Sequence, residues 1–288
     1  MKLDFNLKKL ENKVQIDVDK WISTSPIELR KMNGGTCITC VSTAEEIGKN
    51  VNNIKKGDKL FLSKMSCYIA TAPTSPYIVE GKRYYNIPSS QIIGIFDKDV
   101  DFNSLNMQEN KVLFKKIYTN DSILYLEDNY TMLGEVLKVG ANSMVQQGQI
   151  ILLKDNISTP IKLGSTEYYA ADGKDIIGVF PNKGDVSTES LTIINGNILM
   201  KPYVSKKVLN STLLETPEIN YEDLDYSDVY NRDLFKVYYI DKEIRDIHRG
   251  SVLLVNRDYT SYVYFNNEKY FVIDGKRWVS GKIIERTK

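Results

Sequence analysis

Histidine and cysteine are scarce in this chain. Its 288 residues include a single histidine, His248, and three cysteines, Cys37, Cys40 and Cys67. A structural zinc site needs four ligands of these kinds. Cys37 and Cys40 lie inside a β-branched run, far along the chain from Cys67 and His248, so we expect buried small hydrophobic side chains and no metal. An odd cysteine count is also unlike a secreted disulfide framework, which favours a reducing cytoplasm.

Long apolar runs and an excess of one charge are also absent. The longest apolar runs, such as IILL at residues 150–153, are far too short to span a bilayer. Residues 1–13 contain no apolar stretch of the kind that a signal peptide carries. The 38 basic and 37 acidic residues give a formal net charge of +1, so bulk charge indicates neither nucleic acid nor a membrane as a partner.

What the chain does contain is a pattern that occurs three times. An aromatic pair, a polar gap and an apolar ending recur as YYNIPSSQIIGIF (84–96), YYAADGKDIIGVF (168–180) and YFVIDGKRWVSGKI (270–283). Upstream, a glycine follows a polar pair in IKKGDKLFL (54–62), VQQGQIILL (145–153) and IHRGSVLLV (247–255). These glycines are Gly57, Gly148 and Gly250. Each precedes a strand after a polar turn, so we expect a positive φ at each of them.

Short runs rich in β-branched and aromatic residues fill the rest of each copy. They read TCITCVS (36–42), GEVLKVG (134–140) and FKVYYID (235–241), preceded by residues 14–22, 111–126 and 192–202. Helical periodicity is nearly absent, and its best candidate is residues 240–249. The pattern predicts an all-β fold of three tandem small antiparallel β-barrels, at residues 1–97, 98–182 and 183–288. Residues 97–110 and 181–190 are polar and are interpreted as linkers.

The order of these segments resembles the GroES family of co-chaperonins. Residues 56–58 are similar to the family's turn into a central strand, residues 134–140 to the strand after its mobile loop, and residues 175–180 to its closing strand. The resemblance covers about residues 14–284 and implies a GroES-like barrel for each copy. It also implies that partner binding resides in the mobile loop, which docks on a chaperonin ring through a short apolar element.

Three segments occupy the position of that loop. Residues 23–35 and 205–233 are long enough to reach a partner, whereas residues 127–132 are too short. The candidate docking residues within the two long segments are Ile27, Leu29, Leu213, Leu214, Tyr221, Tyr226 and Tyr230. The three tyrosines belong to an acidic insert that is interpreted either as a solvated loop or as a docking arm that orders on a partner.

An N-terminal arm precedes the first copy. Leu3, Phe5, Leu7 and Leu10 alternate or nearly alternate. This spacing fits a short amphipathic arm, and it also fits a strand added to the sheet edge of a neighbour.

No catalytic constellation is recognisable. The sequence has no nucleophile elbow, phosphate-binding loop or zinc-protease motif. His248 occupies the turn position that Lys55 and Gln146 occupy in the other copies, which favours a solvated turn. We expect no catalytic residue, no cofactor and no metal, so the chain is predicted not to be an enzyme.

Three functions remain as hypotheses. The first is a non-enzymatic structural protein of a phage-type virion or particle that forms or decorates an oligomeric ring, in the host cytoplasm or incorporated in the virion. Its partners would be copies of itself or other structural subunits. Rings of a three-domain chain would hold multiples of three domains, such as twelve. The second is a divergent co-chaperonin that caps a chaperonin ring. The third is an enzyme similar to the zinc dehydrogenases, whose metal ligands and dinucleotide loop the chain lacks.

Overall fold

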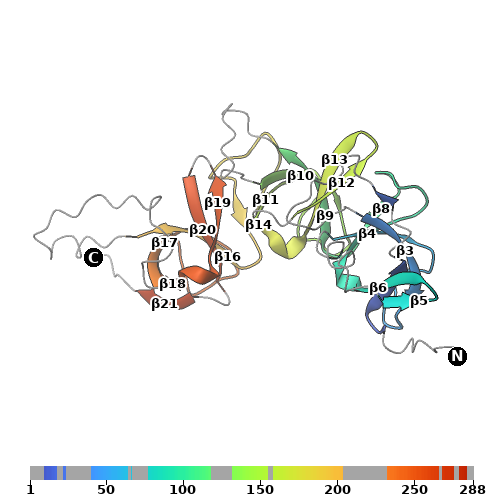
Figure 1. Ribbon diagram of the computed structural model, residues 1–288. Coiled ribbons are helices and arrows are strands. Elements are labelled where there is room, and N and C mark those ends of the chain that lie inside the picture. The colour runs from blue at the N-terminus through green and yellow to red at the C-terminus, as the bar shows by residue number, and fades with distance from the viewer. Residues whose placement is uncertain are drawn as a thin grey trace, which may run out of the picture. The chain divides into compact units, whose positions relative to one another are not determined.

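The computed structural model describes residues 10–17, 22–23, 40–63, 66, 77–117, 132–154, 158–203, 232–265, 268–275 and 279–283. Its strands form three antiparallel sheets, and no helix of seven or more residues occurs among the described residues (Figure 1). The prediction of an all-β protein is therefore confirmed. By Cα proximity the chain divides into one compact unit of residues 1–119, 133–150 and 156–175, and a second unit of residues 120–132, 151–155 and 176–288.

The first sheet has the strand order β5-β6-β1-β3-β4-β7-β8, with β2 also paired to β3. Its strands are β1 (Lys13–Asp17), β2 (Ile22–Ser23), β3 (Cys40–Ile47), β4 (Lys59–Leu62), β5 (Tyr77–Val79), β6 (Lys82–Pro88), β7 (Ile92–Phe96) and β8 (Leu105–Met107).

The second sheet has the order β12-β13-β9-β10-β11-β14-β15. Its strands are β9 (Lys111–Ile117), β10 (Met132–Val139), β11 (Ile150–Leu153), β12 (Thr159–Leu163), β13 (Thr166–Asp172), β14 (Ile176–Phe180) and β15 (Thr192–Ile193).

The third sheet has the order β19-β20-β16-β17-β18-β21. Its strands are β16 (Asn197–Pro202), β17 (Arg232–Ile240), β18 (Val252–Asn256), β19 (Ser261–Phe265), β20 (Glu268–Asp274) and β21 (Val279–Ile283). When the strands are matched in chain order, this is the order of the other two sheets, except that the described residues contain no third-sheet strand equivalent to β8 or β15. The repeat seen in the sequence is thus a repeat of topology.

The turn before β4, β11 and β18 is the same in all three copies. Gly57, Gly148 and Gly250 have φ values of 92°, 86° and 90°, so the predicted positive φ is confirmed. Their N–H groups donate to the carbonyls of Ala44, Val136 and Val237 at 2.8, 2.9 and 2.8 Å. An added Cβ would meet no atom within 4 Å at any of the three glycines. The requirement for glycine is therefore conformational and not steric.

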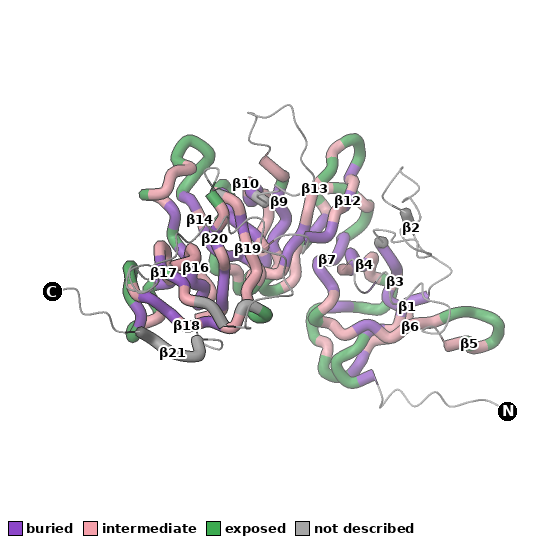
Figure 2. The backbone as a smooth tube through the Cα atoms, turned by 60° about the vertical axis from the view of Figure 1, so that its left-hand side comes forward, coloured by how far each residue is buried: buried purple, intermediate pink, exposed green. Residues whose placement is uncertain are grey.

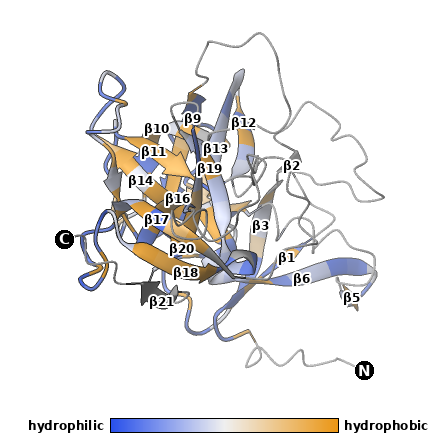
Figure 3. Ribbon diagram, turned by 90° about the vertical axis from the view of Figure 1, so that its left-hand side faces the viewer, coloured by the Kyte–Doolittle hydropathy of each residue, from blue (hydrophilic) through white to orange (hydrophobic). Residues whose placement is uncertain are grey.

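Several strands are apolar without alternation because both of their faces are covered. In β4, Leu60 and Leu62 pack into the core of the first sheet, whereas Phe61 belongs to a second apolar cluster. In β7, Ile92 and Ile93 divide between the same two clusters. Buried residues accordingly run along β7 in Figure 2, and β11, β14 and β18 are hydrophobic in Figure 3. A strand buried on two faces reads as a continuous apolar run.

Residues 240–249 are not helical, so that prediction is wrong. They form successive turns after β17, in which Ile244 N–H donates to Asp241 O at 3.0 Å. The buried Asp241 carboxylate accepts from Glu243 N–H at 2.9 Å and from Gly196 N–H at 2.6 Å. Ile240, Ile244 and Ile247 have helical spacing, but they reach the core of the third sheet through this aspartate-stabilised turn.

The interpretation of residues 97–110 as a linker also needs correction. They contain β8, which pairs antiparallel with β7 in the register Gly94–Met107, Ile95–Asn106 and Phe96–Leu105. The run at residues 192–202 is likewise two strands. Asn195 and Gly196, with φ values of 61° and 71°, form a turn between β15 and β16.

Candidate functional site

The first two sheets share an apolar junction within the first compact unit. Phe61 and Phe96 of the first sheet are buried against Leu113 and Ile161 of the second. The full cluster is Val41, Phe61, Ile93, Phe96, Leu105, Leu113, Ile161, Leu163 and Ala170. Strands β4 and β7 therefore have two roles, since alternate side chains complete their own sheet's core and form the contact with the next copy.

Strand β8 and the loop before it close one side of this junction. The Phe102 ring stacks on Tyr168 of the second sheet, with centroids 5.1 Å apart. Lys138 Nζ lies 4.7 Å from the Phe102 centroid and donates to Leu105 O at 2.8 Å. Burial lowers the pKa of Lys138, and the negative charges of Asp101 and Asp97 oppose this only in part. A lysine of the second copy is thus held against the strand that ends the first sheet.

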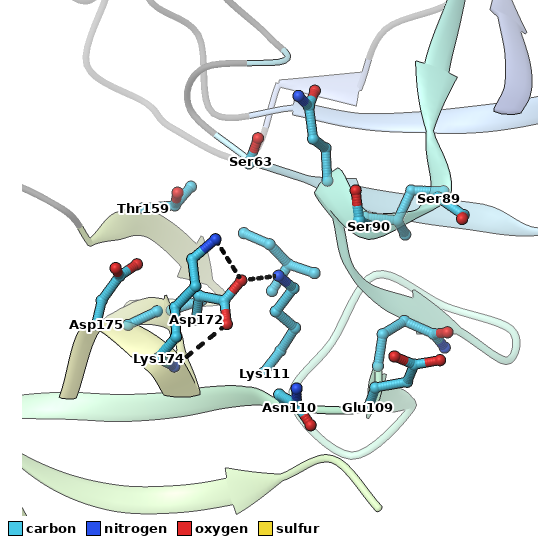
Figure 4. Close-up of a pocket in the computed structure, with 16 residues that line it drawn as sticks. Ser63, Ser89, Ser90, Glu109, Asn110, Lys111, Thr159, Asp172, Lys174 and Asp175 are labelled. Carbon is cyan, nitrogen blue, oxygen red and sulfur yellow. Dashed lines mark hydrogen bonds and ion pairs between the residues drawn. The ribbon is translucent and has the colours of Figure 1, made fainter. Parts of the chain in front are cut away.

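A pocket of about 530 Å³ lies at the edge of the same junction (Figure 4). Its lining residues come from both sheets and are Ser63, Ser89, Ser90, Gln91, Ile92, Ile93, Gln108, Glu109, Asn110, Lys111, Thr159, Ala170, Ala171, Asp172, Lys174 and Asp175. No histidine or cysteine is among them. The volume is within the range of small-molecule sites, but the lining is mostly hydroxyl, amide and charged groups.

Three charged groups of the pocket, Lys111, Lys174 and Asp172, are paired with one another. Lys111 Nζ lies 2.5 Å from Asp172 Oδ2, and Lys174 Nζ lies 3.7 Å from the same oxygen. Burial raises the pKa of Asp172, but the hydrogen bond from Lys111 and the charges of Lys111 and Lys174 lower it by more, so the net shift is downward. Asp172 is therefore ionised at neutral pH and binds Lys111. This arrangement fixes β9 to β13 and does not poise a general acid or base.

A second polar network lies on the opposite wall of the pocket region. Ser66 Oγ lies 2.9 Å from Ser63 Oγ and 2.5 Å from Gln91 Oε1, to which it donates. Gln91 O in turn accepts from Ser63 N–H at 3.1 Å. These bonds hold the segments after β4 and before β7 together. They satisfy the hydroxyl groups and activate none of them as a nucleophile, because none is bonded to a base.

The first copy differs from the other two at the face that forms the junction. In sheets two and three the matching cross-strand pairs are Leu113–Ala170 and Leu199–Val272, and all four residues are buried. In the first sheet the corresponding pair is Gln15–Asn86. On the neighbouring edge strand, β5, the first copy has Tyr77 at the position where the other copies have Ile161 and Val263. Gln15 Nε2 donates to Tyr77 Oη at 2.5 Å, and Tyr77 donates to Asn86 Oδ1 at 2.8 Å.

The seven predicted docking residues lie outside the described residues. They are Ile27, Leu29, Leu213, Leu214, Tyr221, Tyr226 and Tyr230, and their role stays a prediction. Cys37 and Cys67 lie outside as well, and Cys40 begins β3. His248 is exposed in the turn before β18, where its N–H donates to Ser251 Oγ at 3.1 Å. Among the described residues no group of three or more His, Cys, Asp or Glu could hold a metal ion.

Sequence reasoning missed Phe102 and Leu105 as junction residues. A signal for them exists, because FNSLNMQENK (102–111) is similar to FNLKKLENK (5–13), the segment that leads into the first copy. No protein-family model matches the chain, and no curated protein matches it. Within the described part of the chain, no helix is long and apolar enough to cross a membrane.

Proposed function

We propose that the chain is a non-enzymatic assembly protein, built as a tandem array of three GroES-like β-barrels. The observation that carries the proposal is the junction between the first two sheets. There, a face of the first sheet packs on a face of the second sheet through nine buried apolar residues. Strand β8, which pairs with β7 at the edge of the first sheet, contributes to this contact. Surfaces repeated in this way serve to join copies in sequence, as in other repeat proteins. In the adjacent pocket, Lys111 and Lys174 are paired with Asp172, and the Ser63 hydroxyl is bonded to Ser66, which supports a structural role for these groups.

The assembly that best suits such an array is a ring or a ring-bound decoration in a phage-type particle, present in the host cytoplasm before its incorporation in the virion. Its partners are other copies of the chain or other structural subunits. A closed ring of this chain contains a multiple of three domains. The motivation is the triplicated sheet, since a chain of three covalently joined domains fits ring sizes such as twelve domains.

The first experiment is the native mass of the full-length protein, measured by light scattering and native mass spectrometry, followed by electron microscopy of the oligomer. A closed oligomer with a defined subunit count supports the proposal. A protein that stays monomeric and is missing as a stoichiometric component from purified particles overturns it. A parallel pull-down with a chaperonin, with and without ATP, tests the co-chaperonin alternative. Binding that depends on nucleotide would replace the assembly proposal.

A further inference from the structure

The turns that lead into β9 and β16 have the same backbone but different side chains. Gly173 N–H donates to Asn110 O at 2.8 Å, and Gly275 N–H donates to Gly196 O at 2.8 Å. The residue before Asn110 and the residue before Gly196 both have a positive φ, of 26° and 61°. A difference between the two places therefore comes from their side chains.

At the turn before β16, two asparagine side chains fill the space beside β14. Asn195 Nδ2 donates to Ile176 O at 2.8 Å. Asn197, which is buried, donates from Nδ2 to Ile194 O at 2.8 Å and lies 3.4 Å from Ile176 O. The chain thus satisfies the carbonyls at this place with its own amide groups.

At the turn before β9, the corresponding residues are Glu109 and Lys111, and neither can do the same. A glutamate carboxylate accepts hydrogen bonds and donates none. The Lys111 ammonium is already bonded to Asp172, with Nζ 2.5 Å from Oδ2. Both residues line the pocket of about 530 Å³, as does Ile92, which corresponds to Ile176. The pocket therefore lies where the matching turn is filled.

Several polar groups face this pocket without a bond inside the protein. Among the hydrogen bonds of the described residues, none involves the side chain of Ser90, Gln108 or Asn110. Figure 4 shows Ser90 on one side of the pocket and Lys174 on the other. Donors and acceptors from both sheets therefore remain available to a bound molecule.

The charges of the pocket do not select an ion. Its described lining has two lysines and three carboxylates, a formal balance of −1. Lys111 and Lys174 both lie beside Asp172, so an anion would meet a carboxylate next to the two cations. A cation would likewise meet the two ammonium groups. The ligand that fits this lining best is neutral.

The uncharged part of the lining favours a molecule with many hydroxyl groups. Its buried members are mostly apolar and small, and they are Ile92, Ile93, Thr159, Ala170 and Ala171. No aromatic residue is among the described lining residues, so a flat ring such as a nucleobase would find no stacking partner. A hydroxyl group donates and accepts, and it can therefore pair with serine, amide, ammonium and carboxylate groups alike.

We propose that the pocket between the first two sheets binds a sugar, either free or at the end of a glycan. Its hydroxyl groups would bond to the open side chains of Ser90, Gln108 and Asn110, and its C–H groups would cover the small apolar surface of Ala170 and Ala171. The matching turn before β16 has no room for such a ligand. The inference goes beyond the assembly proposal and does not depend on it, because the pocket lies within one compact unit.

The test is saturation-transfer NMR on the full-length protein with glucose, galactose, mannose and N-acetylglucosamine, each added alone. We expect at least one of them to bind with a dissociation constant of about 1 mM, since little apolar surface is buried. The methyl glycosides of the same sugars distinguish the two sources. A glycoside that binds as well as its parent sugar indicates the end of a glycan, and one that does not bind indicates a free sugar.

A variant at the turn locates the site. Asn110→Trp places a large ring at the pocket and should abolish binding. The matched control is Asn12→Trp, because Asn12 has the same position in the turn before β1 and does not line the pocket; it should bind like the wild type. Asn110→Ala, the milder change, should raise the dissociation constant at least about threefold through the loss of a hydrogen bond. Far-UV circular dichroism checks the fold of each variant.

Two results would overturn the inference. One is a wild-type protein that binds none of the four sugars, including the case in which inorganic phosphate alone binds, as seen by ³¹P line broadening. The other is a sugar that binds Asn110→Ala, Asn110→Trp and Asn12→Trp equally well, since its site would then lie elsewhere. Either result leaves the assembly proposal unchanged, because that proposal is tested by the native mass and by the composition of purified particles.

Discussion

Replacing Leu105 with alanine tests whether β8 couples the first two sheets. The side chain is 1% exposed and belongs to the apolar junction. The change removes three buried carbon groups at about 0.8 kcal/mol each, or roughly 2.4 kcal/mol of transfer free energy. The cavity left among Phe61, Phe96 and Ile161 adds to this. We therefore expect the free energy of unfolding to fall by about 3–4 kcal/mol, within the usual range for buried leucine.

The measurement is urea unfolding followed by far-UV circular dichroism, with Asn106→Ala as the matched control. Asn106 is the exposed neighbour in β8, and its replacement should change stability by less than about 0.5 kcal/mol. Hydrogen exchange then locates the effect. The amide protons of Asp97 and Gln108, which donate to Ser104 O and Ile93 O, should exchange faster in Leu105→Ala. A loss below about 1 kcal/mol, or equal losses in the two variants, would refute the coupling role of β8.

Three further predictions follow from the repeated geometry. Gly178→Ala should lower stability by about 1–3 kcal/mol, because its Cβ would lie 2.8 Å from Leu191 Cδ1, and Leu191→Ala should partly rescue it in thermal melts. Strict additivity of the two changes would contradict this. Gly148→Ala should cost about 1–2 kcal/mol in urea unfolding through its φ of 86° alone, and an unchanged midpoint would contradict the turn. Asp172 has a pKa below its ordinary value. Its contribution to the free energy of unfolding is therefore present above about pH 4 and is lost as the pH falls through the pKa of the folded state. The stability of Asp172→Asn should therefore decline less steeply with acid than that of the wild type, and parallel curves would show that the pairing with Lys111 contributes nothing.

A strand was predictable from the sequence where all of its residues are apolar. IIGIF in β7 and IILL in β11 are apolar throughout, and period and composition are enough to identify them. Strand β8 was not predictable in this way, because its three residues read Leu-Asn-Met in a polar setting. It is a strand because Gly94 and the second sheet provide a place for Leu105, which is a tertiary effect.

The helical interpretation of residues 240–249 was wrong for a related reason. The spacing of Ile240, Ile244 and Ile247 is helical. The Asp241 carboxylate, however, accepts hydrogen bonds from backbone N–H groups, and these bonds favour a turn. The pocket could not be derived from the sequence. Lys111 and Asp172 are 61 residues apart and become neighbours only through the register of β9 and β13. The turn glycines were predictable because one backbone conformation accounts for all three.

The polar network of Gln15, Tyr77 and Asn86 makes this face of the first sheet a poor surface for packing another copy in front of it. A gene duplication that placed a fourth copy in front of the first would bring an apolar face, like the one that contains Phe61 and Phe96, against this network. Such a protein would be poorly packed until all three residues had changed. A copy added after β21 would not meet this network. Longer relatives of this chain are therefore expected to have gained their extra copies at the C-terminal side.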